Sequence, residues 1–467
     1  MKKTISLLLC GLLLVLSSCA IEEQVDQPQS KPSIESAEAS PEESTLVFDS
    51  LPEKQESSPA QGDDPSERSP EMPSESPSAA PSDSPAVSPS VAPVSPEEPS
   101  ESPSKPQREA SKGLQMGIMS GKAYVLGIGS CRDKEVVIPS EYNGKAVAGI
   151  GDDAFRANKQ ITSVALPEGV SSVGRAAFAG CTALEEILFE GSVGTVGESA
   201  FSGCTALRSV TLPEGVKSIG GQAFAGCTAL EEIVLPSTLR TVGERAFEEC
   251  TALQGVSIPK GVSVLPRMVF FRCTALSEVS LPVSVKSVGE SAFEWCTSLK
   301  EITLPENLTT LKSGAFSNGG LESIVLPSGV KTLEDAVFAN CKALKSVTLN
   351  EGLVTLSGFS FCTALERIEI PSTVKTLGYQ AFAGCTALKE VTLPQGLSTI
   401  GDRAFAKAYD LSQIVIPAGV SEMGGHVFDG CIALKTICCE AEKLPAGWQS
   451  GWAGGCKAEI LWGEQTA

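Results

Sequence analysis

The chain has 467 residues and a formal net charge of −20, with one His and few aromatic residues other than Phe. Residues 20–112 hold twenty Asp/Glu and six Lys/Arg (−14) and residues 1–19 carry +2, which leaves −8 for residues 113–467. The lack of a basic stripe that could neutralise phosphates excludes nucleic acid as a partner.

The first 19 residues, MKKTISLLLCGLLLVLSSC, have the features of an export signal. Lys2 and Lys3 precede an apolar run that is too short for a stable membrane span. The run ends in Leu-Ser-Ser-Cys, which resembles the lipobox of bacterial lipoproteins and implies acylation of Cys19. We predict a signal peptide over 1–18 and a lipid anchor at Cys19 as the sole membrane contact. The alternatives are an ordinary signal peptide with an incidental Cys, and an uncleaved membrane helix.

The segment after Cys19 is rich in Pro, Ser and Glu, and seventeen of the 30 prolines fall within residues 20–112. Pro removes backbone donors, the charges repel one another, and almost nothing apolar is available for burial. We therefore predict a disordered linker over 19–112, which would reach about 290 Å in a polyproline II conformation. Such a spacer would carry a domain clear of a membrane; the alternative is a docking tail for a partner.

Phe recurs at a nearly fixed spacing through the remainder of the chain. The first seven intervals are 23 residues, the next two are 22 and 21, and the last three are again 23. The thirteen positions are Phe155, Phe178, Phe201, Phe224, Phe247, Phe270, Phe293, Phe316, Phe338, Phe359, Phe382, Phe405 and Phe428. A repeat of this length predicts a solenoid, whose long regular surface suits binding of macromolecules.

The repeat spanning 207–229 illustrates the predicted role of each position. Alternation places Val210 and Leu212 inward and Ser209 outward, which indicates a strand that Pro213 terminates. A second apolar segment follows, and we expect Gly220 to permit a sharp corner. The side chains of Ala223, Phe224 and Cys227 then fill the space behind that corner.

The motif LPEGVKSIGGQAFAGCTAL and its relatives resemble the BspA-like leucine-rich repeat family of bacterial surface proteins. The resemblance implies a right-handed leucine-rich repeat solenoid, an α/β-type but mostly β fold of about 12–13 coils. It also implies an N-terminal strand cap over 113–154, repeats over 155–437 and a C-terminal cap over 438–467. Asn143-Gly144 suits a tight hairpin turn in the first cap, and Trp448, Trp452 and Trp462 would cover the last coil.

Ten cysteines follow the Phe residues at a fixed offset, and we interpret them as buried thiols that act as small hydrophobic side chains. The predicted core ladder is represented by Phe178, Phe201, Phe224 and Phe247 together with Cys181, Cys204, Cys227 and Cys250. The alternative for an exported protein is a disulfide framework. A Cys438–Cys456 disulfide remains possible, whereas no CxxC pair or neighbouring His favours a metal site.

Outward-facing strand positions form two rows, one acidic in its first half and one rich in Ser, Thr and Val. We take this face as the candidate binding surface, with Glu186, Thr211, Glu232, Glu278, Glu301, Thr303, Thr348, Glu390 and Thr392 as candidate residues. An extracellular protein or glycan is the expected ligand. The spacing is irregular between residues 311 and 362, where Lys312 and Glu334 replace the corner Gly; a bend, a specialised site and plain drift are the alternatives.

The expected function is that of a lipid-anchored, monomeric protein displayed at the bacterial cell surface, with no cofactor and no bound metal. The family resemblance implies adhesion to host matrix proteins or to other cells. The first alternative is a structural or assembly module that binds envelope polymers of its own cell. The second is an enzyme, which the lone His426 disfavours because a nucleophile would have no other imidazole base.

Overall fold

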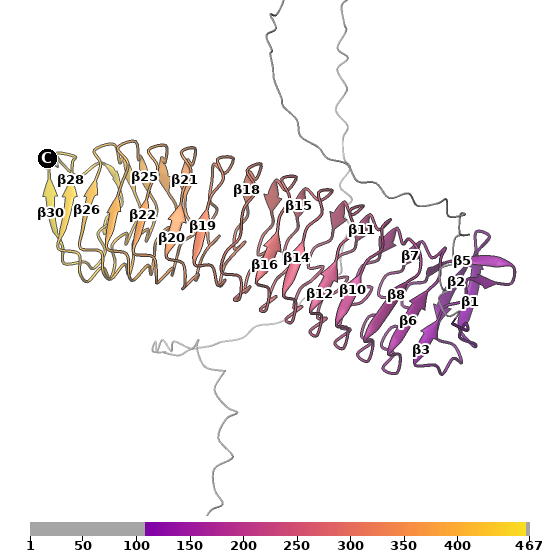
Figure 1. Cartoon of the computed structure of the whole chain (residues 1–467). Coiled ribbons are helices and arrows are strands. Elements are labelled where there is room, and N and C mark those ends of the chain that lie inside the picture. Colours follow the sequence, from indigo (N-terminus) through magenta and orange to yellow (C-terminus); the bar gives the residue numbers. More distant parts are fainter. Residues whose placement is uncertain (1–107, 464–467) are drawn as a thin grey trace, which may run out of the picture. The chain divides into compact units, whose positions relative to one another are not determined.

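The computed structural model describes residues 108–463, which form thirty short β-strands and no helix. The strands stack into a mostly-β leucine-rich repeat solenoid of about 15 turns, which confirms the predicted fold (Figure 1). The expected 12–13 coils were those marked by Phe, and strands before and after them extend the stack. The predicted signal peptide over 1–18, the lipid on Cys19 and most of the linker over 19–112 lie outside the described residues.

One strand from most coils lies on a common side of the solenoid, which we call the strand face. Its strands are β3 (Glu135–Val137), β6 (Ser163–Leu166), β8 (Glu186–Phe189), β10 (Ser209–Thr211), β12 (Glu232–Val234), β14 (Gly255–Ser257), β16 (Glu278–Ser280), β19 (Ser323–Val325), β20 (Ser346–Thr348), β22 (Arg367–Glu369), β24 (Glu390–Thr392), β26 (Gln413–Ile416), β28 (Thr436–Cys439) and β30 (Glu459–Trp462). Neighbouring strands pair in parallel with a shift of one repeat, as in Ser209 opposite Glu232.

A second row of parallel strands follows the face strands, most of which end at a Pro. These corner strands are β7 (Ser172–Val173), β9 (Thr195–Val196), β11 (Ser218–Ile219), β13 (Thr241–Val242), β15 (Val264–Leu265), β17 (Ser287–Val288), β18 (Thr310–Leu311), β21 (Thr355–Leu356), β23 (Thr376–Leu377), β25 (Thr399–Ile400), β27 (Glu422–Met423) and β29 (Gly447–Trp448). A Gly follows eight of these twelve strands, but the φ of Gly220 is not positive. A Cβ on Gly197 would lie 2.6 Å from the carbonyl carbon of Gly174. Glycine is therefore required by close approach between coils rather than by the expected sharp corner.

The N-terminal strands join the corner row. β1 (Gln115–Met119) pairs antiparallel with β2 (Lys122–Gly127), and β2 pairs in parallel with β5 (Lys145–Ile150), which leads to β7. β4 (Glu141–Tyr142) pairs antiparallel with β5 across Asn143-Gly144, and both turn residues have positive φ. The predicted tight hairpin turn is thus confirmed, since two consecutive positive φ values are typical of a type I′ turn.

The third side of each coil carries the Phe, flanked by two left-handed residues. In the coil of Phe201, Ser199 has φ +53° and Gly203 has φ +70°. The backbone N–H groups of Ser199, Phe201 and Gly203 donate hydrogen bonds to carbonyls of the next coil, at 2.7–2.8 Å. The alternating conformation turns every second N–H toward the neighbouring coil, so this side is bonded along the stack without forming a regular strand.

The core runs along the whole solenoid as a column of stacked Phe rings. Consecutive rings from Phe155 to Phe428 have centroids 5.0–5.9 Å apart and interplanar angles of 2–18°. Every Phe ring after Phe155 lies between two other aromatic rings, so a single coil could not bury its own Phe.

Candidate functional site

All nine candidate binding residues are exposed on the strand face. Seven lie on face strands: Glu186 on β8, Thr211 on β10, Glu232 on β12, Glu278 on β16, Thr348 on β20, and Glu390 and Thr392 on β24. Glu301 and Thr303 occupy the equivalent position in their coil, but that coil has no face strand. The face therefore presents these side chains to solvent in the register that the repeat period dictates.

The strand face is divided into separate sheets. The face strands pair in the groups β3-β6-β8, β10-β12-β14-β16, β19-β20, β22-β24 and β26-β28-β30. Glu301, Ile302, Thr303 and Leu304 take part in no backbone-to-backbone hydrogen bond within residues 108–463, so the pairing stops on both sides of this segment. The widest interruption of the face thus coincides with two of the candidate residues.

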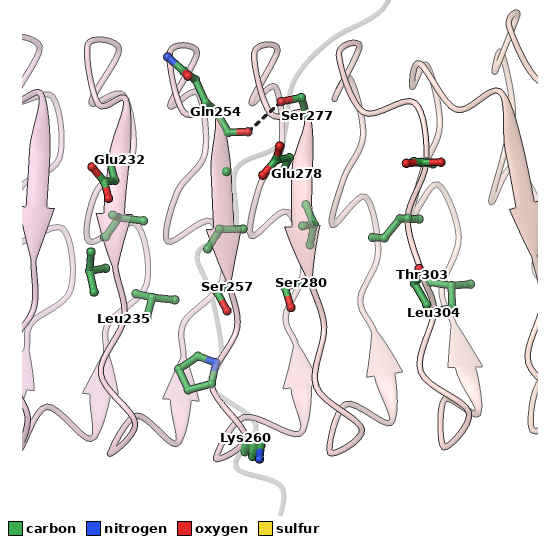
Figure 2. Close-up of a pocket in the computed structure, with 18 of the residues that line it drawn as sticks. Glu232, Leu235, Gln254, Ser257, Lys260, Ser277, Glu278, Ser280, Thr303 and Leu304 are labelled. Carbon is green, nitrogen blue, oxygen red and sulfur yellow. Dashed lines mark hydrogen bonds between the residues drawn. The ribbon is translucent and has the colours of Figure 1, made fainter. Parts of the chain in front are cut away.

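A shallow groove of about 1550 Å³ runs over five successive coils of the strand face and includes this interruption. It extends from β12 through β14 and β16 to the segment 301–304 and β19, and it brings Glu232, Glu278, Glu301 and Thr303 together. Figure 2 shows Glu232 and Glu278 on opposite sides of the strand that carries Ser257; Ser280 is on the same strand as Glu278, and Thr303 lies farther along the stack. Glu186, Thr211, Thr348, Glu390 and Thr392 lie outside this groove.

The groove is strongly acidic. Five carboxylates line it, those of Glu231, Glu232, Glu278, Glu301 and Glu306, against the single cation of Lys260. Within residues 108–463, Glu231 alone among the five has an ion-pair partner, Arg208 at 3.3 Å. Four carboxylates therefore face solvent without a neutralising side chain, and the local field favours a cationic ligand.

Most residues that line the groove were not among the candidates from sequence, and Gly255, Lys260 and Val325 are three of them. Gly255 lies opposite both Glu232 and Glu278 in the strand register, so the acidic row has an empty position. The sequence could have revealed this gap, because Gly255 is a glycine in an outward-facing row whose other residues all have side chains. A Cβ at Gly255 would have its nearest neighbour at 3.6 Å, so the position has free space above it.

The ten ladder cysteines are buried free thiols, and each donates a hydrogen bond that the repeat pattern did not reveal. Every thiol donates to the carbonyl oxygen of the Phe of the preceding coil, at 3.0–3.3 Å. Burial raises the pKa of the Cys181 thiol to about 11 and that of the Cys385 thiol to about 12. Protonated thiols in such positions are poor nucleophiles and poor metal ligands.

The remaining cysteines and the terminal cap carry no disulfide. Cys438 and Cys456 are both free and partly exposed, so the possible disulfide between them is not formed. No group of three His, Cys, Asp or Glu side chains suited to a metal ion occurs among residues 108–463. In the same range, no helix is long and apolar enough to cross a membrane.

Trp448 and Trp452 are buried at the C-terminal end of the core, while His426 is exposed. Trp452 packs edge-on against Phe428, with ring centroids 6.1 Å apart, and against Trp448 at 4.9 Å. Trp462 lies 5.8 Å from Trp448. The two buried indoles close the Phe column, and His426 is not among the residues that line the groove.

Comparison with known proteins places this solenoid in a family. A search of the curated proteins found no match. A leucine-rich repeat protein from Bacteroides ovatus is 29% identical, with 71% of this chain and 94% of that chain covered and a TM-score of 0.59. A leucine-rich cell surface protein from Faecalibacterium prausnitzii is 26% identical over 78% of this chain and 99% of that chain, with a TM-score of 0.46.

A family model described as the BspA type leucine-rich repeat region matches residues 148–277, 264–363 and 356–444 in six copies. These segments cover most of the solenoid, including the acidic groove and the Phe column. The chain therefore belongs to the BspA-type leucine-rich repeat family.

Proposed function

We propose that this protein is a monomeric lipoprotein of the bacterial cell surface, and that it binds host matrix proteins or other cells through its strand face. The observation that carries the proposal is the open acidic groove, whose free carboxylates lie on a rigid stack of strands. A leucine-rich repeat solenoid is a scaffold for binding proteins, and we propose neither catalysis nor a cofactor. The lipid on Cys19 and the linker would hold this face away from the membrane.

The test is binding of the purified full-length protein to immobilised matrix proteins, mucins, glycans and peptidoglycan. We expect saturable binding to a matrix protein, and we expect the triple change Glu232→Lys, Glu278→Lys, Glu301→Lys to weaken it at least tenfold. Glu369→Lys is the matched control, because Glu369 is exposed on the same face but lies outside the groove. Binding to peptidoglycan alone would instead support a structural role in the envelope of the producing cell.

A further inference from the structure

We infer that the groove takes an extended, cationic protein segment whose basic side chains alternate along the chain. This inference rests on the proposed function and specifies the partner that the strand face recognises. It is carried by three features of the groove: its uncompensated charge, the empty position at Gly255, and the length over which the carboxylates are spread.

Charge distinguishes this groove from a second hollow on the strand face. A smaller hollow over β20 and β22 is lined by Glu351 and Glu369 but also by Lys345 and Arg367, so its charges balance. The groove over β12 to β19 has one cation for five carboxylates. Unpaired carboxylates on one face attract a cationic partner and repel an anionic one.

Gly255 creates a slot between two carboxylates. Glu232, Gly255 and Glu278 are in register on three neighbouring strands. Because adjacent strands are about 4.8 Å apart, the two Glu backbones are separated by about 10 Å with no side chain between them. A Lys or Arg side chain descending at Gly255 would reach both carboxylates, each of which has no ion-pair partner within residues 108–463.

A second cationic position lies farther along the row. Glu278 and Glu301 belong to successive coils, so the midpoint between them is about one and a half coil spacings, roughly 7 Å, from Gly255. Residues two apart on an extended chain are about 6.7 Å apart and project to the same side. The carboxylate spacing therefore fits basic residues at positions i and i+2 of an extended segment that runs along the solenoid axis.

The rest of the groove suits a peptide of about six residues. The four coil steps from β12 to β19 span about 19 Å, which is the length of six extended residues. Ser257, Ser280 and Thr303 offer hydroxyl groups along the second row, as Figure 2 shows, and Val234 and Val325 stand exposed at the two ends. The unbonded backbone of 301–304 adds further donors and acceptors.

The acidic N-terminal segment of the same chain is excluded as the occupant by its charge. Residues 20–112 carry a net −14, from twenty Asp/Glu and six Lys/Arg. The four free carboxylates would repel such a segment as a whole, so we assign the occupant to another protein.

The test uses the purified full-length protein and a fluorescein-labelled hexapeptide, acetyl-TKTKTV-amide, in which the lysines are two residues apart. We expect saturable binding by fluorescence anisotropy that weakens as salt rises from 20 to 300 mM, as screening requires. Adjacent lysines in TKKTTV, or glutamines in TQTQTV, should reduce the affinity at least fivefold. The double change Glu232→Gln, Glu278→Gln should reduce the affinity at least tenfold. Gly255→Lys should also reduce it, because the new lysine would occupy the space between the two carboxylates.

Glu369→Gln is the control and should leave peptide affinity unchanged. Equal binding of the neutral peptide, or an equal loss in the control variant, would overturn the inference. So would an absence of peptide binding at millimolar concentration by a protein that still binds a matrix protein, and in that case the proposed adhesion would stand. Loss of matrix binding altogether, with the peptide still bound in the groove, would instead reject the adhesion and leave the groove specificity intact.

Discussion

The thiol of Cys227 donates a hydrogen bond to the carbonyl oxygen of Phe201 in the preceding coil, with 3.1 Å between sulfur and oxygen. The same oxygen also accepts the backbone N–H of Cys204 at 3.1 Å. The thiol therefore fills a small buried space and adds a second donor to a buried carbonyl. This pair of roles explains why Cys rather than Ala occupies the slot in ten coils.

We predict that Cys227→Ala lowers the free energy of unfolding by about 1–2 kcal/mol, through the lost sulfur volume and the lost donor. The reverse change is available at Ala408, where the slot lacks a thiol and is fully buried. Ala408→Cys should raise the stability by up to about 1 kcal/mol. Urea unfolding midpoints measure both changes. A neutral Cys227→Ala together with a destabilising Ala408→Cys would show that the thiol bond contributes nothing.

The second prediction concerns thiol accessibility. Among residues 108–463, Cys438 and Cys456 are the only cysteines that are not buried. At pH 8 we expect iodoacetamide to modify these two in the native protein, and all fourteen cysteines of this range after denaturation in urea. Peptide mass spectrometry gives the count. Rapid native labelling of Cys227 or Cys250 would contradict the buried ladder, and loss of Cys456 labelling under oxidising conditions would indicate a disulfide that is absent here.

The third prediction follows from the raised thiol pKa values. Folding holds the pKa of Cys181 at about 11 and those of Cys341 and Cys385 at about 12, all above the usual value of 9.0. The folded state then binds more protons than the unfolded state above pH 9, so stability is present below that pH and is lost as pH rises through 11–12. Thermal unfolding temperatures should be constant from pH 7 to 8.5 and fall from pH 9 to 11.5, less steeply in a Cys181→Ala, Cys385→Ala variant.

Much of this architecture is predictable because the period of 23 residues fixes the register. Once Val210 and Phe224 are assigned inward, the same assignment applies to every coil, and Glu232 and Glu278 must fall on one exposed row. The paired left-handed residues were not predictable, since Ser199 and similar residues rarely adopt positive φ outside such a turn. They are imposed by the bonds to the next coil rather than by local preference.

The extent of the groove also could not be predicted from the sequence. The segment Glu301-Ile302-Thr303-Leu304-Pro305 matches the repeat, yet it forms no strand. The next interval along the chain, from Phe316 to Phe338, is 22 residues instead of the usual 23. The interruption of the face lies directly before this shortened interval, and no residue within 301–305 announces it.

The fourth prediction concerns the irregular stretch at Lys312 and Glu334. Lys312 Nζ lies 2.7 Å from Glu334 Oε1, and the backbone N–H of Ser313 donates to Glu334 Oε2 at 2.9 Å. Side chains thus connect two successive coils in which Lys312 and Glu334 stand in place of the corner Gly. Glu334→Ala should cost about 1–2 kcal/mol because the backbone N–H loses its acceptor. Lys312→Ala should cost at most about 0.5 kcal/mol, since the ion pair is half exposed. The thermal unfolding temperatures of the two variants check this difference, and an equal decrease in both would contradict the larger role of the Ser313 hydrogen bond.

The fifth prediction concerns the end of the Phe column. Trp452 covers Phe428, and Trp448 donates its indole N–H to the carbonyl oxygen of Val420 at 3.0 Å. Replacement of Trp452 by Ala would expose the last Phe ring and leave a large cavity, at a cost of about 3–5 kcal/mol. Because each coil of a solenoid is stabilised mainly by its two neighbours, the loss of stability should be largest near the C-terminus and should decrease toward β12.

Hydrogen exchange measured by mass spectrometry should resolve this gradient. In Trp452→Ala we expect faster exchange over residues 405–463 and unchanged exchange over residues 200–300. Trp448→Phe is the control, because it keeps an aromatic ring while it removes the indole hydrogen bond and part of the ring volume, and it should cost less than Trp452→Ala. A uniform increase along the solenoid would mean that the coils unfold as one cooperative unit, and that the terminal indoles stabilise the groove coils as strongly as their own neighbours.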